Sequence, residues 1–518
     1  IIGTPDSEAY SGAWVVWWGQ QTLLETGLPP HWAPALNFPT GRSVHCLPLL
    51  DALLTLPLRP VMSASAIYNL LVLLHIALAF CGSWLLLRSL SDDPWPVLPG
   101  ALAFATSTYL FSYFASGPLE AFCVGWIPVA LWAVPRAIRQ GGRRGVALSG
   151  LLMGALFLSN PYYMVFSGVG VAWLLLVQVR GRLDWRMLMR AGIAGLLALA
   201  VMAPQIWAIE QSRGVTLQDM APGMAQHMLH KVYVQDALNF LLPVEGYYHY
   251  TKPLRVYVGL ALLGLSLLGL RRPGWRRWAL LGGASWIFAL GAFLEVGGHR
   301  LAINGHDIPM PAYFLCHYLP PFTSIIHPFR ILPLVLLSLG ALTTLGLQRL
   351  RPGLRPPAAL AAAALILVDQ LALAPVSVPP PRSSAEVPAF YHSLAQDPEP
   401  YAVMDIFSSE EPLCFGPSMI YQAVHGRALV YDIFPPDAEV MNNALVQLVG
   451  WDVLSGPPPR DPRLCEDARA LGRLGVRYVV KHLGQSTPDP RVELIKECGL
   501  PIARKDQEVL VFRLDGKR

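Results

Sequence analysis

Long uninterrupted apolar runs are the feature of this sequence that most constrains its fold. Four of them are each about 20 residues long, near residues 66 to 90, 189 to 209, 330 to 348 and 357 to 375. A helix of that length crosses the roughly 30 Å hydrocarbon layer of a bilayer. Inside that layer every backbone polar group needs a partner within the protein, which a helix provides. The runs therefore predict an all-α polytopic membrane protein.

Shorter apolar runs separate these four, and Pro118 and Asn160-Pro161 mark two of the junctions. They lie near residues 97 to 114, 117 to 135, 146 to 159, 161 to 178, 254 to 271 and 278 to 294. We read them as additional spans, which gives a bundle of about ten. The chain is 53% hydrophobic and 14% charged, a balance typical of membrane proteins rather than soluble globular ones.

The positive charges sit in short clusters between the apolar runs, and with about ten spans every cluster falls on one face. This is the pattern of cytoplasmic loops, and it places everything after Pro375 on the other face. The net charge of +5 therefore indicates topology and not nucleic-acid binding. The clusters are Arg136, Arg139, Arg143 and Arg144; Arg180, Arg182, Arg186 and Arg190; Arg271, Arg272, Arg276 and Arg277; and Arg349, Arg351 and Arg355.

Composition divides the chain into three expected domains. Residues 1 to 62 are an exported first loop with two interfacial helices, and Trp14, Trp17 and Trp18 are expected to anchor the first at the membrane surface. Residues 63 to 375 are the transmembrane helical domain. After a proline-rich linker, residues 376 to 518 are expected to form a soluble, non-cytoplasmic α/β domain. Its strands are predicted near 401 to 406, 427 to 433, 477 to 481 and 508 to 513, and its helices near 387 to 396 and 462 to 474.

Two further features concern the start of the chain and its cysteines. Because the chain begins at Ile1, without an initiator methionine, and enters directly on an exported loop, we expect a first transmembrane helix upstream. The seven cysteines form no CxxC pair and no dense framework, so they imply neither zinc nor a disulfide scaffold. Their number and spacing are compatible with an isolated disulfide.

The predicted helices carry almost no ionisable residues, and His75 is the main exception. A single histidine in an apolar helix more often bonds a neighbouring helix than carries protons. Ion-coupled transporters need acids or bases at mid-depth, so this pattern disfavours a transporter. No Gly-rich phosphate loop, HExxH or nucleophile elbow appears either, which disfavours catalysis by the C-terminal domain.

The exported face begins with two carboxylates, Asp6 and Glu8. Either carboxylate is suited to deprotonate an acceptor hydroxyl, and together they are suited to hold a divalent cation such as Mg²⁺ or Mn²⁺. The simpler alternative is that Asp6 or Ser7 caps the helix that starts there, with Glu8 favouring its positive end.

Cations on the same face are candidates for binding a phosphate: Arg330, Lys252, Arg255 and Arg42. Arg330 is the best of them because it begins a long apolar helix at the depth of lipid phosphates, and guanidinium binds two oxygens. The alternative is that these side chains only extend to lipid headgroups. Glu120, and Glu245 with His249, are weaker acid or base candidates, which are alternatively ordinary solvated loop residues.

Several motifs resemble those of a known superfamily. They are the acidic opening with its Trp-rich helix, Asn37-Phe38-Pro39-Thr40-Gly41, Trp126-Ile127-Pro128, Asn160-Pro161-Tyr162-Tyr163, Pro328-Phe329-Arg330, Val387-Pro388-Ala389-Phe390-Tyr391 and Leu474-Gly475-Val476-Arg477-Tyr478-Val479-Val480. Over nearly the whole chain this pattern resembles the GT-C polytopic glycosyltransferases, and more closely the bacterial YfhO-like membrane proteins.

The resemblance implies a polyprenyl-phosphate sugar donor and a catalytic acid in the first exported loop, which Asp6 matches. No DxD repeat and no WWD signature is present, so protein N-glycosylation is disfavoured. It also implies a bacterial inner membrane location, with the C-terminal domain in the periplasm or outside the cell.

These features lead to one hypothesis and one rival. The hypothesis is an inverting sugar transfer from polyprenyl phosphate to an envelope glycan, lipid or protein. In it Asp6 is the base, Glu8 assists or orients a metal, and Arg330, Lys252 and Arg255 stabilise the leaving phosphate. The rival is a non-catalytic assembly or lipid-handling membrane protein whose C-terminal domain binds a partner.

Overall fold

A computed structural model describes most of the 518 residues. The described ranges are 1–4, 7–44, 48–179, 184–212, 227–232, 234–242, 256–374, 376–406, 416–431, 438–450, 458–483 and 489–515. Every structural statement below concerns these ranges.

Six helical segments in the described ranges are long and apolar enough to cross a membrane: Ala64–Arg88, Trp95–Ala115, Leu119–Gln140, Trp185–Gln211, Pro328–Leu347 and Pro352–Leu373. Four of them contain or largely overlap the four long runs of the sequence, and two fall on the shorter runs that start near 97 and 117. The other shorter runs form helices of more limited length, α8 (Arg143–Ser159), α9 (Pro161–Val179), α13 (Leu260–Leu267) and α14 (Trp275–Ala289). The total of about ten spans stays a prediction.

Helix α16 (Leu332–Leu347) is the centre of the bundle, since all of its residues are buried. Its neighbours approach closely at small residues. A Cβ placed on Gly100, in α4 (Leu98–Ala105), would lie 2.8 Å from the carbonyl oxygen of Gly340. A Cβ on Gly269, just after α13, would lie 2.0 Å from the carbonyl oxygen of Leu342. Small residues at such crossings allow the backbone contact on which packing in a bilayer depends.

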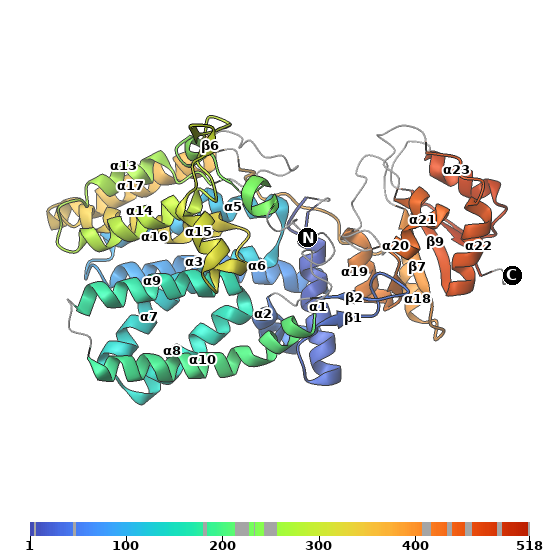
Figure 1. Ribbon diagram of the computed structural model, residues 1–518, viewed down its shortest axis with the longest axis horizontal. Helices are drawn as coiled ribbons and strands as arrows, with labels where there is room; N and C mark the ends of the chain where they lie inside the picture. The colour runs from blue at the N-terminus through green and yellow to red at the C-terminus, as the bar shows by residue number, and fades with distance from the viewer. Residues whose placement is uncertain are drawn as a thin grey trace.

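The outer helices differ from α16 in the way expected of a bundle surrounded by lipid. α10 (Trp185–Gln211) buries only 22% of its most apolar window, whereas the span that contains α16 buries 94%. α10 lies beside α8, and α3 (Ala64–Arg88) lies beside α7 (Trp126–Gln140). The long helices run side by side in Figure 1.

Residues 389–515 form a second region, which Figure 1 shows at the opposite end of the molecule. Its sheet has the strand order β10-β11-β9-β7-β8, with β7 parallel to β8 and β9 and the other pairs antiparallel. The strands are β7 (Ala402–Ile406), β8 (Ala428–Leu429), β9 (Val476–His482), β10 (Ile502–Lys505) and β11 (Val509–Arg513). The accompanying helices are α18 (Ala389–Ala395), α19 (Gly416–His425), α20 (Ala438–Met441), α21 (Ala444–Val449), α22 (Leu464–Leu474) and α23 (Pro490–Glu497).

The strands predicted over 401 to 406, 477 to 481 and 508 to 513 coincide with β7, β9 and β11. The helices predicted over 387 to 396 and 462 to 474 coincide with α18 and α22. A disulfide joins Cys465 of α22 to Cys498 at the end of α23. That this region is a separate soluble domain stays a prediction.

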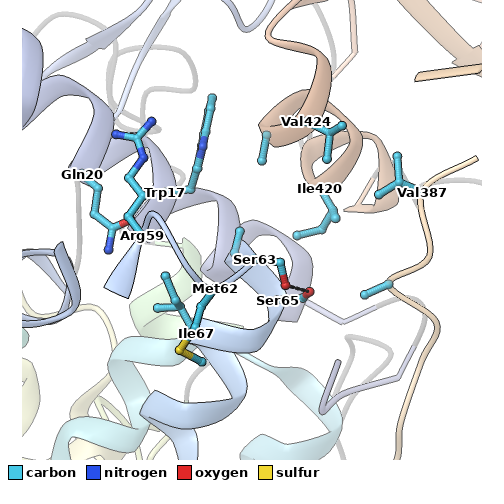
Figure 2. Close-up of a pocket in the computed structure, with 13 residues that line it drawn as sticks. Trp17, Gln20, Arg59, Met62, Ser63, Ser65, Ile67, Val387, Ile420 and Val424 are labelled. Carbon is cyan, nitrogen blue, oxygen red and sulfur yellow. Dashed lines mark hydrogen bonds between the residues drawn. The ribbon is translucent and has the colours of Figure 1, made fainter. Parts of the chain in front are cut away.

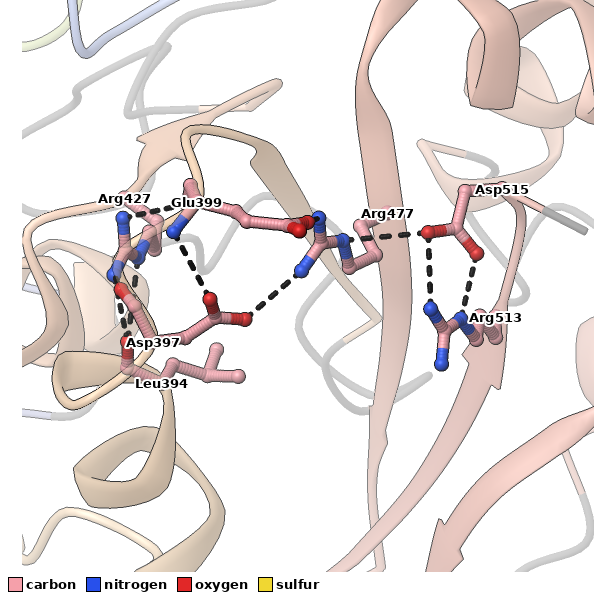
Figure 3. Close-up of polar contacts among 7 residues, drawn as sticks. All are labelled: Leu394, Asp397, Glu399, Arg427, Arg477, Arg513 and Asp515. Carbon is pink, nitrogen blue, oxygen red and sulfur yellow. Dashed lines mark hydrogen bonds and ion pairs between the residues drawn. The ribbon is translucent and has the colours of Figure 1, made fainter. Parts of the chain in front are cut away.

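An ion-pair network centred on Arg477 ties the first helix of this region to its sheet (Figure 3). The guanidinium of Arg477 contacts Asp397 at 2.8 Å and Asp515 at 3.4 Å, and it also pairs with Glu399. Its Cζ lies 4.0 Å from the ring centroid of Tyr401. A network with several partners holds its geometry better than an isolated surface pair.

The first loop lies between the bundle and the C-terminal region, and its helix α1 (Ala9–Thr26) runs across the ends of the long helices (Figure 1). Trp14 is 1% exposed, and its Nε1 donates to Gln422 Oε1 of α19 at 2.6 Å. Gln422 Nε2 in turn donates to the carbonyl oxygens of Ala35 at 2.5 Å and Arg427 at 3.0 Å. Trp14 is therefore an internal packing residue, and its interpretation as a membrane anchor is wrong.

Substitution Gln422→Ala should loosen the junction between α1 and α19, because it leaves the buried Trp14 N–H and the Ala35 carbonyl without their partner. The expected cost is about 1–3 kcal/mol. Hydrogen exchange of the full chain in detergent should show faster exchange in both helices. Gln447→Ala, at an exposed position of α21, is the matched control. Equal exchange in the two variants would contradict this role.

The buried side chain of His425 makes a second prediction about the C-terminal region. Burial lowers the pKa of His425 to about 4, and the Arg427 charge acts in the same direction while Asp405 opposes it. The folded state therefore keeps this imidazole neutral, with Nδ1 accepting from the Arg427 amide at 2.9 Å. Below pH 6.5 the unfolded chain gains a proton that the folded chain does not, so stability falls as the pH drops toward 4.

This effect should amount to about 3 kcal/mol between pH 6.5 and 4. It is measured as the pH dependence of the unfolding free energy of the C-terminal region, by hydrogen exchange of the full chain. His425→Gln should flatten the dependence, whereas His392→Gln, at an exposed position, should leave it unchanged. An unaltered slope in His425→Gln would refute the assignment.

Candidate functional site

Two of the residues selected from the sequence, Glu120 and Arg330, meet in the structure although 210 positions separate them. Glu120 lies in α6 (Leu119–Phe122), and Arg330 lies in the short helix η7 (Pro328–Ile331) that leads into α16. Arg330 Nη2 is 3.4 Å from Glu120 Oε1. The Arg330 side chain is 12% exposed and the Glu120 side chain is 23% exposed, so the pair is largely shielded by protein.

The Asn160-Pro161-Tyr162-Tyr163 motif supports this pair from a third element. Asn160 Oδ1 accepts from the amides of Tyr162 at 2.9 Å and Tyr163 at 3.4 Å, which satisfies free N–H groups at the start of α9. Asn160 Nδ2 donates to the carbonyl oxygen of Glu120 at 3.0 Å. The Tyr162 ring lies under the guanidinium of Arg330, 5.6 Å from Cζ to the ring centroid. One motif thus positions both members of the ion pair.

Arg330 retains hydrogen-bonding capacity beyond its contact with Glu120. That contact is single and long, whereas a guanidinium presents several donors in one plane. Arg330 Nε is buried and has no hydrogen-bond partner in the described part of the chain. The side chains of Tyr109, Tyr113 and Tyr163 also lie within electrostatic range of Arg330. The arginine is therefore suited to bind a further anionic group.

The start of the first loop lies against the turn that precedes Glu120. Thr4 Oγ1 donates to the carbonyl oxygen of Ala115 at 2.9 Å. Gly117 has φ of 81°, and a Cβ added there would lie 2.4 Å from the backbone nitrogen of Ala9. Only glycine allows this contact between the turn and the first residue of α1.

Tyr68 links the two acidic positions. Its hydroxyl donates to the carbonyl oxygen of Gly117 at 2.8 Å, and it lies within electrostatic range of both Glu120 and Glu8. Glu8, Tyr68, Glu120, Tyr162 and Arg330 therefore gather at one end of the bundle. We call these five residues the mouth cluster.

The structure shows which of Ser7 and Glu8 caps the start of α1. Helix α1 starts at Ala9, and its amide donates to Ser7 Oγ at 3.3 Å. Glu8 occupies the N-cap position, but its side chain makes no capping hydrogen bond and is exposed. Ser7 therefore takes the capping role. Asp6 lies outside the described residues, between Thr4 and Ser7.

The remaining candidates are not part of the mouth cluster as described. Lys252, Arg255 and His249, together with Glu245, lie outside the described residues. Arg42 lies in β2 (Arg42–Ser43), which pairs with β1 (Trp32–Ala33). Its neighbour Ser43 donates to Ser212 at the end of α10, at 3.4 Å.

Sequence reasoning missed a buried polar group behind the mouth cluster. Asp51 of α2 (Leu49–Thr55), His75 of α3 and Cys123 are all buried, and their ligand atoms lie within 4.8 Å of one another. His75 Nε2 is 2.7 Å from Asp51 Oδ2 and 3.5 Å from Cys123 Sγ. The prediction that His75 bonds a neighbouring helix is confirmed.

This group does not have the geometry of a nucleophilic triad, because the carboxylate and the thiol both face the same imidazole nitrogen.

The helices carry more buried ionisable residues than the sequence predicted, since Asp51 and Asp369 are both buried. Asp369 accepts from the Tyr257 hydroxyl at 2.5 Å and the Ala261 amide at 2.7 Å, so it stabilises the start of α13. The sequence signal that could have identified Asp51 as a buried acid is its position within an apolar run, Leu49-Leu50-Asp51-Ala52-Leu53.

A cavity of about 230 Å³ lies where α1, the start of α3 and α19 meet (Figure 2). Its walls are mainly apolar, with Trp17, Ile67 and Ile420 facing the space. Its polar groups are already engaged: Gln20 Nε2 donates to Thr55 Oγ1 at 3.0 Å, and Arg59 donates to Gln21. Trp17 lies about 14 Å from Glu8 along α1, so this cavity is distinct from the mouth cluster.

Comparison with solved structures finds a similar fold in the arabinofuranosyltransferase AftD from mycobacteria. The TM-score is 0.56 at 15% identity, and the match covers 99% of this chain but 38% of AftD. The chain thus spans well under half of AftD. An oligosaccharyltransferase of Archaeoglobus fulgidus has a TM-score of 0.49 at 12% identity, covering 93% of this chain and 66% of that one.

ArnT from Cupriavidus metallidurans has a TM-score of 0.42 at 12% identity, with coverage of 98% and 94%. The fold assignment rests on the likeness to AftD. No family model and no curated protein matches the sequence. Closeness to YfhO-like proteins stays a prediction. The likeness to AftD shows a shared fold, in agreement with the resemblance seen in the sequence.

Proposed function

We propose that this chain transfers a sugar from a polyprenyl-phosphate donor to a cell-envelope acceptor, and that the mouth cluster is the site. The observation that carries the proposal is the contact between Glu120 and Arg330 beside the first residues of α1. Three segments distant in sequence meet here, and they contribute the carboxylate of Glu120, the guanidinium of Arg330 and the first residues of the chain, which include Glu8. Capping and lipid contact alone give no reason for this convergence.

Arg330 is the proposed ligand of the donor phosphate. It begins α16, at the end of the apolar bundle, where a lipid-linked phosphate would lie with its isoprenoid chain alongside the helices. Its unused Nε and the planar array of donors suit two phosphate oxygens. Glu120 holds the guanidinium in place through one long contact, which the phosphodiester monoanion of an incoming donor is able to replace. Lys252 and Arg255 are proposed as additional phosphate ligands from their sequence positions.

The proposed reaction requires one base and one anion site. The acceptor hydroxyl oxygen attacks the anomeric carbon, and its proton passes to the Asp6 carboxylate. The bond between the anomeric carbon and the phosphate oxygen breaks, and its electron pair leaves with polyprenyl phosphate, whose charge Arg330 stabilises. Attack from the side opposite the phosphate inverts the anomeric configuration.

Glu8 is proposed to orient the acceptor or a divalent cation beside Asp6. A Mg²⁺ or Mn²⁺ ion bound by these carboxylates would supply positive charge near the reacting oxygens. Because Asp6 lies outside the described residues, its proposed roles as base and as cation ligand rest on the sequence. The sugar-transfer step above does not depend on a metal ion. Glu120 is proposed as a positioning residue for Arg330.

We also propose the finer topology: about ten spans, domains at 1 to 62, 63 to 375 and 376 to 518, and a C-terminal α/β domain on the non-cytoplasmic side of a bacterial inner membrane. The disulfide between Cys465 and Cys498 supports an oxidising compartment for that domain. The positions of the arginine clusters support the same orientation.

Substitution Asp6→Asn should lower sugar transfer by about 100-fold or more, because it removes the proposed base and leaves the fold intact. The measurement is release of polyprenyl phosphate from a panel of polyprenyl-phosphate monosaccharides, in membranes that supply the native acceptor. Asp92→Asn, an exposed carboxylate between α3 and α4, is the control and should keep full activity. Wild-type turnover in Asp6→Asn would remove the base assignment. No turnover with any donor in the wild type would favour the non-catalytic rival.

Substitution Arg330→Lys should weaken binding of polyprenyl monophosphate about tenfold, since it keeps the charge but loses the planar pair of donors. Glu120→Gln should tighten binding instead, because it frees Arg330 from its competing carboxylate. Both are measured by titrating the purified full chain with polyprenyl monophosphate. Arg300→Lys is the matched control, because Arg300 is likewise paired with a carboxylate, Glu295, at 3.1 Å. Unchanged affinity in all three variants would exclude Arg330 from the phosphate site.

A further inference from the structure

A second, larger cavity lies at the opposite end of the helices from the mouth cluster. Its volume is about 570 Å³, and its walls come from the end of α3, the second half of α7, the second half of α9 and the start of α14. The first three helices begin at or near the mouth cluster, which places the cavity about 20 Å away along α7. It shares no residue with the mouth cluster or with the cavity of Figure 2.

Four arginines line this cavity: Arg136 and Arg139 from α7, and Arg276 and Arg277 from α14. Its lining residues include no aspartate and no glutamate. Within the described ranges, no ion pair joins Arg136, Arg276 or Arg277 to a carboxylate. Like charges gathered in a concave site repel one another unless an anion enters.

Two of the arginines are held in place and oriented by tryptophans. Arg136 Nη1 donates to the carbonyl oxygen of Trp132 at 2.7 Å, and its guanidinium lies 5.4 Å from the Trp132 ring. The guanidinium of Arg277 lies 5.7 Å from the Trp278 ring. Arg277 Nε is buried and has no hydrogen-bond partner among the described residues. A buried donor without a partner is costly, and a bound phosphate oxygen would satisfy it.

The start of α14 adds to this positive potential. Gly274 lines the cavity and precedes the helix, which has 15 residues and no side-chain cap at its first turn. The free N–H groups of a helix start favour an anion. Two independent features, the partnerless Arg277 Nε and the uncapped helix, thus favour the same kind of ligand.

The rest of the cavity wall distinguishes a lipid from a soluble anion. Leu86, Leu131 and Leu174 form its buried back wall, whereas Val177 at the end of α9 is 37% exposed. In a bilayer an exposed apolar side chain such as Val177 contacts acyl chains, and tryptophans beside arginines are typical of the headgroup level. A basic pocket between transmembrane helices is suited to an acidic lipid headgroup.

We propose that this arginine cavity binds the phosphodiester headgroup of an acidic glycerophospholipid from the leaflet that surrounds it. The Arg136 and Arg277 guanidiniums bind the phosphate oxygens, Arg139 and Arg276 close the outer side, and Val177 contacts an acyl chain. The arginine clusters that the sequence presents as topology signals would then have a binding role as well. The proposal is independent of the sugar-transfer activity.

The test is lipid binding by the purified full chain in detergent, with phosphatidylglycerol compared to phosphatidylcholine by native mass spectrometry. The wild type should bind phosphatidylglycerol at least tenfold more tightly at low salt, and the preference should weaken as salt is raised. The double variant Arg136→Gln/Arg277→Gln should lose this preference. The matched control is Arg143→Gln/Arg144→Gln, which removes the same charge from exposed positions at the start of α8 and should keep the preference.

Three further arms decide the interpretation. Thermal unfolding of both double variants should match the wild type, and Arg136→Lys/Arg277→Lys, which keeps the charge, should retain an intermediate preference. Inorganic phosphate at millimolar concentration should not displace the lipid. Displacement by phosphate would overturn the lipid assignment in favour of a soluble anion. Equal lipid preference in the wild type and in Arg136→Gln/Arg277→Gln would overturn the site itself.

Discussion

The ion pair between Glu120 and Arg330 is the interaction on which the rest of the site depends. A guanidinium at the start of an apolar helix is costly to place near a bilayer interior unless it has polar partners. Here Glu120 and the Tyr162 ring provide them. The pairing also fixes where η7 meets α6, and so where α16 enters the bundle. Charge placement and helix placement are therefore set by the same contact.

The first loop completes this end of the molecule because it is held from several sides. Ile2 pairs with Arg382 in an antiparallel bridge, and its amide donates to Asn69 Oδ1 of α3 at 2.9 Å. Tyr10 donates to the carbonyl oxygen of Ser384 at 2.7 Å, and Trp14 bonds Gln422. Residues 1–4 and the start of α1 are thus held by α3, by the segment from Ala115 to Gly117 and by the linker to the C-terminal region. The C-terminal region therefore helps to hold the first loop in position, although the proposed catalytic residues lie outside that region.

Much of the fold was predictable from the sequence because its signals are local. Apolar length located the four long spans, and short buried runs located β7, β9 and β11. For the candidate site, the sequence identified individual residues but not their contact. Glu120 and Arg330 were selected separately, and no sequence signal indicates that two residues 210 positions apart are in contact. The role of Tyr162 was missed for the same reason, although its motif had been singled out.

The errors have physical causes as well. Trp14 was read as a membrane anchor because an amphipathic helix looks alike whether its apolar face meets lipid or α19. Asp51 was overlooked because its helix is short, and its partner His75 lies on another element.

The most direct test of the central claim is an experimental structure of the full chain with polyprenyl monophosphate bound. The account predicts that the phosphate lies against the guanidinium of Arg330, beside the start of α1, with the contact to Glu120 lengthened or broken. A phosphate bound elsewhere, with the Glu120–Arg330 pair intact, would contradict it.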